Sequence, residues 1–145
     1  MPTADHDHRA IAISTYGQCW DLLESDRSAV DDRNLISLAF TSRYHWLKAG
    51  GAQEWAISDW MVSRCAAAIG EGSLSMTFAK SALDGVAEDS PAWLRASLHE
   101  GMARAYLAVG DHDGKARHVA TAHKILESEP SQEDRELIES QIATI

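Results

Sequence analysis

The spacing of apolar residues is the feature that most constrains the fold of this chain. Apolar side chains recur roughly every three to four positions along most of the sequence, the period that places them on one face of an α-helix. In residues 5–25, for example, Ile13, Tyr16, Trp20 and Leu23 form one stripe. No segment shows the sustained alternation of apolar and polar residues that is typical of a half-buried strand. The sequence therefore predicts an all-α fold.

Glycine, proline and polar segments divide this pattern into seven predicted helices. Gly70 and Gly110 follow apolar stripes, as expected just beyond a helix C-terminus. Ser90 and Pro91 are typical of a helix start, with serine as N-cap and proline at the first helical position. Residues 131–134 resemble a capping box. The expected helices cover about residues 5–25, 32–48, 52–69, 73–87, 91–109, 113–127 and 131–143.

Short connections between these helices predict antiparallel αα-hairpins. A comparison of the sequence with itself supports repeated units: at a shift of 40 residues, Gly70 falls on Gly110 and Arg64 falls on Arg104. We expect hairpins over about residues 5–48, 52–87 and 91–127, with the polar segment 131–143 as a cap. A chain of 145 residues is expected to form one such domain.

One stretch of the chain resembles the tetratricopeptide repeat family. The matching positions in its first helix, turn and second helix are Met102, Ala103, Tyr106, Gly110, Asp111, Ala116 and Ala120. The shift of 40 residues exceeds the family's usual period of about 34. Residues 42–46, 59–64 and 133–137 also resemble small bacterial helical-repeat proteins of unassigned function. The resemblance implies a stack of helical hairpins and specifies no activity.

Charge and cysteine content restrict the setting in which the protein acts. The net charge is −9, and the 13 lysines and arginines are scattered, so we expect neither nucleic acid nor an anionic membrane as partner. We find no signal peptide and no uncharged apolar stretch long enough to span a bilayer. Cys19 and Cys65 lie in apolar stretches without a CxxC motif, which indicates a reducing, cytoplasmic compartment.

Sequence motifs for metal binding or catalysis are absent. Seven histidines occur, but no HExxH and no Glu-x-x-His pair is found, and His118 and His123 are spaced to lie on different helix faces. No serine lies on a glycine elbow, and no glycine-rich phosphate loop follows a strand. The sequence therefore predicts no metal, no cofactor and no catalytic residue.

The candidate binding residues are polar and aromatic side chains within the predicted helices. They are Arg43, His45, Trp46, Asp59, Trp60, Arg64, His99, Glu100 and Arg104. Arg64 and Arg104 are expected to project alike from successive hairpins toward a concave surface, where they would clamp a carboxylate or a peptide C-terminus. Solvated helix faces and structural ion pairs, such as an i,i+4 pair of Glu100 and Arg104, are the alternative interpretation.

Two functional hypotheses follow. The first is a non-catalytic helical-repeat module that binds a protein partner or another copy of itself. Apolar residues on more than one side of residues 5–25 predict a homodimer formed through the N-terminal hairpin. Most of the five tryptophans are expected in the core, and an exposed one among Trp46, Trp55 and Trp60 would anchor a partner.

The second hypothesis is a small-ligand-binding protein or an enzyme. It requires Arg64, Arg104, Glu100, His45 and Asp59 to converge within hydrogen-bond reach in a concave pocket.

Overall fold

The computed structural model describes residues 4–145, and this part of the chain contains seven helices and no strand. The helices are α1 (Asp5–Leu23), α2 (Ala29–Ala49), α3 (Ala52–Ala68), α4 (Gly72–Asp84), α5 (Ala92–Ala108), α6 (His112–Leu126) and α7 (Gln132–Ile142). The all-α prediction of six helices followed by a short C-terminal one is confirmed.

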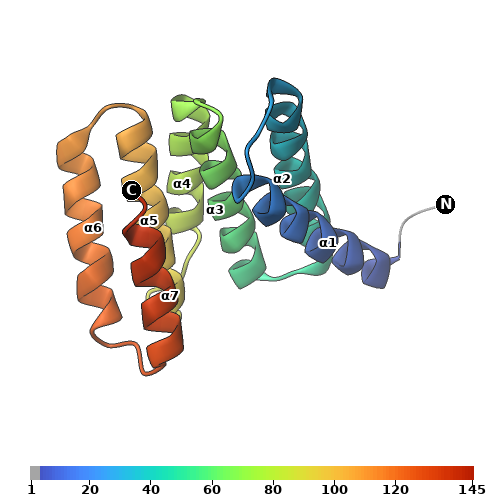
Figure 1. Cartoon of the computed structure of the whole chain (residues 1–145). Helices are drawn as coiled ribbons and strands as arrows, with labels where there is room; N and C mark the ends of the chain where they lie inside the picture. Colours follow the sequence, from blue (N-terminus) through green and yellow to red (C-terminus); the bar gives the residue numbers. More distant parts are fainter. Residues whose placement is uncertain (1–3) are drawn as a thin grey trace.

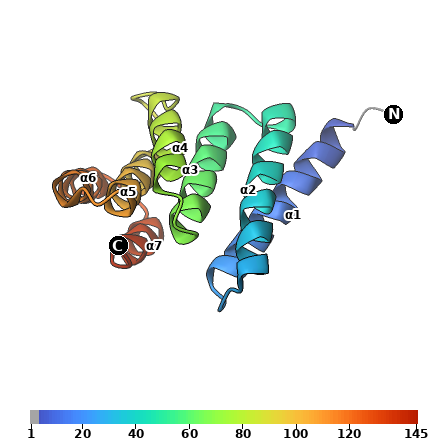
Figure 2. The ribbon, with the colours of Figure 1, turned by 90° about the horizontal axis from the view of Figure 1, so that it is seen from above.

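The helices pair in chain order as stacked hairpins. α1 packs on α2, α3 on α4 and α5 on α6, and the three pairs lie side by side (Figures 1 and 2). The first helices of the hairpins are neighbours, since α3 contacts both α1 and α5. α7 does not extend the row but turns back alongside α5. The molecule therefore has a side formed by α1, α3, α5 and α7.

The main core surrounds α3, the first helix of the middle hairpin. Its fully buried members include Cys19 of α1, Leu35 of α2, Val62 of α3 and Leu98 of α5. A smaller cluster of Ala96, Ala122, Leu126, Ile138 and Ile142 fixes α7 against α5 and α6. Burial of these side chains supplies the main stabilising free energy, at roughly 25 cal/mol per Å² of apolar surface. The isoleucines of α7 thus contribute to its position against α5 and α6.

Two glycines end α3 and α5 with the same geometry. Gly70 has a φ of 84° and Gly110 a φ of 82°, in the left-handed region that favours glycine. After Gly70, the backbone N–H of Glu71 donates to the carbonyl of Ala66, which closes the helix end. The two turns that align in the sequence therefore adopt one conformation.

The start of α2 lies earlier than the polar composition of residues 25–32 predicts. Ser28 is the N-cap: its hydroxyl accepts a hydrogen bond from the backbone N–H of Asp31 at 3.2 Å. The carboxylate of Asp31 accepts one from the backbone N–H of Ser28 at 3.0 Å. This capping box adds nearly a full turn, and α2 begins at Ala29.

The start of α5 also differs from the prediction. Pro91, not Ser90, is the N-cap, and no side chain at that position caps the helix. The backbone N–H of Trp93 instead donates to Glu129, a buried residue between α6 and α7, at 2.8 Å. The carboxylate of Glu129, distant in sequence, thus caps the N-terminus of α5, where the sequence predicts a cap from Ser90.

Within the described residues, no helix has both the length and the apolar character needed to cross a membrane.

Candidate functional site

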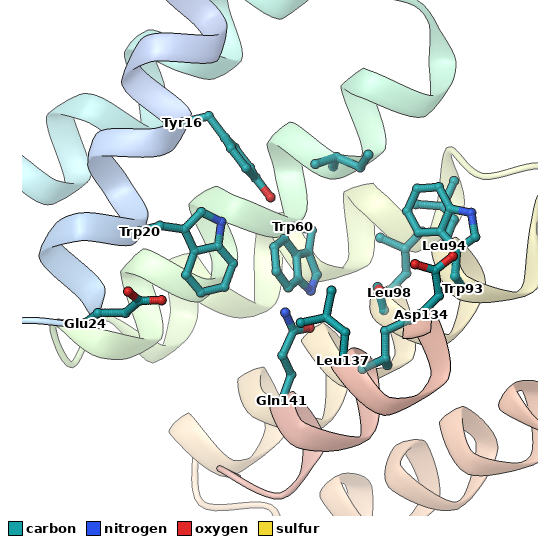
Figure 3. A pocket seen from close by; sticks show the side chains of 13 residues that line it. Tyr16, Trp20, Glu24, Trp60, Trp93, Leu94, Leu98, Asp134, Leu137 and Gln141 are labelled. Atoms are coloured by element: carbon teal, nitrogen blue, oxygen red, sulfur yellow. The ribbon is translucent and has the colours of Figure 1, made fainter. Parts of the chain in front are cut away.

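An open groove of about 370 Å³ lies between α1 and α7, above α3 and α5 (Figure 3). We call it the aromatic groove, because one tyrosine and three tryptophans line it. Its principal lining residues are Tyr16, Trp20, Trp60, Trp93, Leu98 and Leu137. Four aromatic side chains border one open hollow here, and so it is the candidate site.

Helical spacing explains how these side chains reach one groove. Tyr16 and Trp20 are four residues apart on α1, so they project from the same face. Leu137 and Gln141 have the same spacing on α7 and face them from the opposite wall (Figure 3). Trp60 of α3 lies beneath and is almost fully buried. Four helices therefore each contribute one strip of side chains.

The floor of the groove is an aromatic pair with a guanidinium group packed against it. The rings of Trp20 and Trp60 have centroids 5.9 Å apart and are tilted by 46°. The guanidinium carbon of Arg64 lies 4.9 Å from the Trp20 centroid and 5.9 Å from that of Trp60, within cation–π distance. Burial raises the pKa of the neighbouring Tyr16, which is therefore neutral near pH 7.

A fully buried carboxylate, Glu100, connects this floor to two arginines. Trp60 Nε1 donates to its Oε2 at 2.9 Å. Arg104 donates two hydrogen bonds to Glu100 Oε1, from Nε at 2.9 Å and from Nη2 at 2.8 Å. Arg64 Nη1 donates to the same oxygen at 3.3 Å. Burial, and secondly the charge of Arg104, lower the pKa of Arg64 from its usual value. The two arginines expected to clamp a ligand thus hold a carboxylate of their own chain.

The same arginines border a second hollow of about 340 Å³, together with Arg27. It lies where the C-terminal ends of α1, α3 and α5 meet. Arg27 donates to the carbonyls of Leu23 at 3.5 Å and Ala68 at 3.3 Å, which end α1 and α3. Positive charge is favourable beside such carbonyls. Helix-end carbonyls therefore account for Arg27, and Glu100 accounts for Arg64 and Arg104.

Arg43 and Asp59 form a separate ion pair between α2, α3 and α4. Arg43 Nε donates to Asp59 Oδ1 at 2.6 Å, and Ser81 Oγ donates to Oδ2 at 2.7 Å. The guanidinium of Arg43 also lies 5.2 Å from the ring centroid of Phe78. Every contact of this pair joins helices to one another, and it does not line the aromatic groove.

The two candidate histidines each pair with another histidine. His45 Nδ1 lies 2.7 Å from His8 Nδ1, between α2 and α1, and His99 Nδ1 lies 2.9 Å from His118 Nδ1, between α5 and α6. Burial, then the charges of His118 and Arg95, lower the pKa of His99 to about 4. Burial, then His8, also lower the pKa of His45. His45 and His99 are therefore neutral near pH 7.

Trp46 is buried beside the start of α3. The guanidinium carbon of Arg9 lies 5.2 Å from the centroid of the Trp46 ring. The backbone carbonyl of Trp46 accepts a hydrogen bond from Trp55 Nε1 at 3.0 Å. Trp55 itself remains 43 % exposed, and it is the exposed member of the three tryptophans near this corner.

The nine candidate residues thus occupy separate places. Arg64, Glu100 and Arg104 meet at the floor of the aromatic groove, together with Trp60. The five side chains required by the small-ligand hypothesis do not converge, because His45 is engaged with His8 and Asp59 with Arg43.

The chain matches no model of a known protein family, no curated protein and no solved structure. The resemblance to tetratricopeptide repeats therefore remains a prediction. Among the described side chains, no three His, Cys, Asp or Glu residues gather where they could hold a metal ion. Function has to be inferred from the geometry of the groove.

Sequence reasoning missed the residues that form the walls of the groove. The sequence places Tyr16 and Trp20 on one apolar stripe of the first predicted helix, and Leu137 in a polar cap. The signal in the sequence was the surplus of apolar residues in α1, which include both aromatic side chains. No local signal shows that α7 turns back beside α5 and leaves those rings in a groove instead of a closed core.

Proposed function

We propose that the protein is a non-catalytic, tetratricopeptide-like interaction module that binds a segment of a protein partner in the aromatic groove. The observation that carries this proposal is the convergence of large apolar side chains from four helices on one open hollow. Leu137 remains 55 % exposed on its wall. Apolar side chains of a ligand would cover these surfaces, as the buried anchors of protein interfaces do.

The chemistry of the groove favours binding over catalysis. Its polar lining residues are few, and Arg64, Arg104 and Glu100 beneath it neutralise part of one another's charge. In the described chain, no cysteine, lysine or histidine lines it. An open hollow of this size accommodates a few side chains of a bound segment, since ligand sites span roughly 300–1,000 Å³. A small apolar ligand is the alternative occupant.

The test uses substitutions of exposed leucines, so that folding is preserved. Leu137→Asp places a charge on the wall of the groove, and Leu47→Asp makes the same change on the exposed face of α2. Peptides selected from a displayed random library against the wild-type protein are titrated against both variants. We expect Leu137→Asp to weaken binding at least ~10-fold, because an ionised carboxylate opposes burial of apolar groups, and Leu47→Asp to change it little.

The proposal would be contradicted if no peptide were selected. It would also be contradicted if the selected peptides bound both variants with the affinity they have for the wild type. Far-UV circular dichroism and melting temperature verify that each variant is folded.

Self-association through the N-terminal hairpin is a further part of the proposal. Ile11 and Ile13 of α1 are exposed, whereas Tyr16 and Trp20 of the same helix belong to the groove. A homodimer would therefore use the two isoleucines. Light scattering measures the oligomeric state, and a strict monomer at high concentration would contradict the predicted homodimer. The cytoplasmic location remains a prediction.

A further inference from the structure

The charged residues that line the aromatic groove are all of one sign. Glu24, just beyond the end of α1, and Asp134, in the first turn of α7, are both acidic. In the described chain, no lysine, arginine or histidine lines the groove with them. A ligand in this groove therefore meets two carboxylates and apolar surface.

Neither carboxylate has a cationic partner among the described residues. The ion pairs there join Arg27 to Asp32, Arg43 to Asp59, Arg64 and Arg104 to Glu100, and Lys124 to Glu127. The side-chain oxygens of Glu24 and Asp134 take part in none of them. By contrast, the buried acids Asp59 and Glu100 are both paired. The two negative charges at the groove are thus left open to a ligand.

The two carboxylates lie at different ends of the groove. Figure 3 shows Glu24 on the side of Trp20 and Asp134 on the side of Trp93, with Leu137 and Trp60 between them. Each end therefore offers an anionic group together with an indole ring, and both attract cations. The middle is mainly apolar and carries no charge, with the uncharged amide of Gln141 beside Trp60 and Leu137.

We propose that the segment bound in the aromatic groove carries an apolar anchor flanked on both sides by basic residues. This inference rests on the proposed function and names the chemistry of its ligand. The apolar side chain packs between Leu98, Trp60 and Leu137, and the two basic groups reach Glu24 and Asp134. The net charge of −9 strengthens the attraction for a basic segment over a distance set by the ionic strength.

Arg64 lies behind the groove and does not line it. It packs against the rings of Trp20 and Trp60, and Glu100, which Arg64 shares with Arg104, offsets part of its charge. The contact shows that these indole faces already accept a guanidinium group.

The experiment uses three synthetic peptides with one apolar core and with lysine, glutamine or glutamate flanks. Calorimetric titration measures their affinity for the wild type, for Glu24→Gln/Asp134→Asn, and for the control Asp84→Asn/Asp89→Asn. The control makes the same change in net charge at exposed positions that do not line the groove. We expect the wild type to prefer the lysine-flanked peptide over the glutamine-flanked one by at least ~10-fold at an ionic strength of about 0.15 M.

The groove variant should reduce that preference to below ~3-fold, while the control variant keeps it. Equal loss in both variants would overturn the inference, since it would show attraction by net charge alone. Equal affinity for all three peptides, with binding still sensitive to Leu137→Asp, would overturn the inference and leave the proposed function standing. No binding of any of the three peptides would overturn the inference, and the proposed function would then be decided by the library selection.

Discussion

Trp60 Nε1 donates a 2.9 Å hydrogen bond to Glu100 Oε2, and the two residues are 40 positions apart, the same shift that aligns Gly70 with Gly110. Equivalent positions of successive hairpins thus hold a donor and its acceptor. The bond orients the indole that forms the floor of the aromatic groove, and Arg64 and Arg104 both bind the carboxylate behind it. The stacking of α3 on α5 and the shape of the groove therefore depend on one buried acid.

Glu100→Gln should destabilise the protein by about 2–4 kcal/mol, because two guanidinium groups lose their buried counter-charge while the amide keeps the shape of the side chain. The control is Glu127→Gln, whose pair with Lys124 is exposed and 3.6 Å long, and it should cost less than about 0.5 kcal/mol. Urea unfolding measures both. Equal stability of the two variants would show that the Glu100 network does not hold α3 to α5.

Two glycine substitutions should change stability in opposite directions. A Cβ at Gly101 would lie 2.7 Å from Cδ1 of the buried Trp60, so Gly101→Ala forces the ring to move and should destabilise by about 1–3 kcal/mol. A Cβ at Gly17 meets nothing within 4 Å, so Gly17→Ala should stabilise α1 by about 0.5–1 kcal/mol. Thermal unfolding measures whether each substitution raises or lowers stability. The near-ultraviolet circular dichroism spectrum should change for Gly101→Ala alone.

Glu129 should control how firmly α7 is attached. Its Oε2 accepts from the backbone N–H of Trp93 and its Oε1 from that of Ser131, so one carboxylate connects the start of α5 to the start of α7. Glu129→Ala should cost about 1–2 kcal/mol, as loss of a helix cap does, and should speed amide exchange in α7. The exposed Glu139→Ala is the control. Unchanged exchange in α7 would show that its isoleucines alone hold it.

Secondary structure was predictable here because its determinants are local. The apolar period and the glycines at 70 and 110 specify where helices run and end, and the pairing of neighbours follows from short connections. One exception involves a distant partner, because Glu129 replaces the cap expected from Ser90. The other, the early start of α2, comes from the local capping box of Ser28 and Asp31. The i,i+4 pair of Glu100 and Arg104 was predicted and is confirmed, since both residues lie on one helix.

The candidate site was less predictable, because it depends on how separate helices meet. Cys19 and Trp20 are adjacent in an apolar stretch, yet Cys19 is fully buried and Trp20 lines the groove. The two side chains project from different faces of α1, so Cys19 enters the core and Trp20 does not. Whether the face of Trp20 borders a groove depends on the place of α7, which the sequence indicates only as a polar helix. Arg64 and Arg104 do project toward the same point, but the carboxylate between them comes from Glu100 rather than from a ligand.

The histidine pair between α5 and α6 should make stability fall as the medium becomes acidic. The pKa of His99 is lowered to about 4 in the folded protein by burial, His118 and Arg95, and the pKa of His118 is lowered by burial and Arg117. In the unfolded chain these imidazoles have a pKa near ~6.5. Between about pH 6.5 and pH 4 the unfolded state therefore binds protons that the folded state does not, so the free energy of unfolding decreases as pH falls through this window.

The measurement is the urea midpoint as a function of pH for the wild type, His99→Gln and the exposed control His123→Gln. His99→Gln should flatten the decline between about pH 6.5 and pH 4, because glutamine at this position cannot take up a proton in the unfolded chain. His123→Gln should leave the wild-type slope. If the decline were as steep in His99→Gln as in the wild type, the acid sensitivity would have to come from other groups, and the 2.9 Å contact between His99 and His118 would carry no pH dependence.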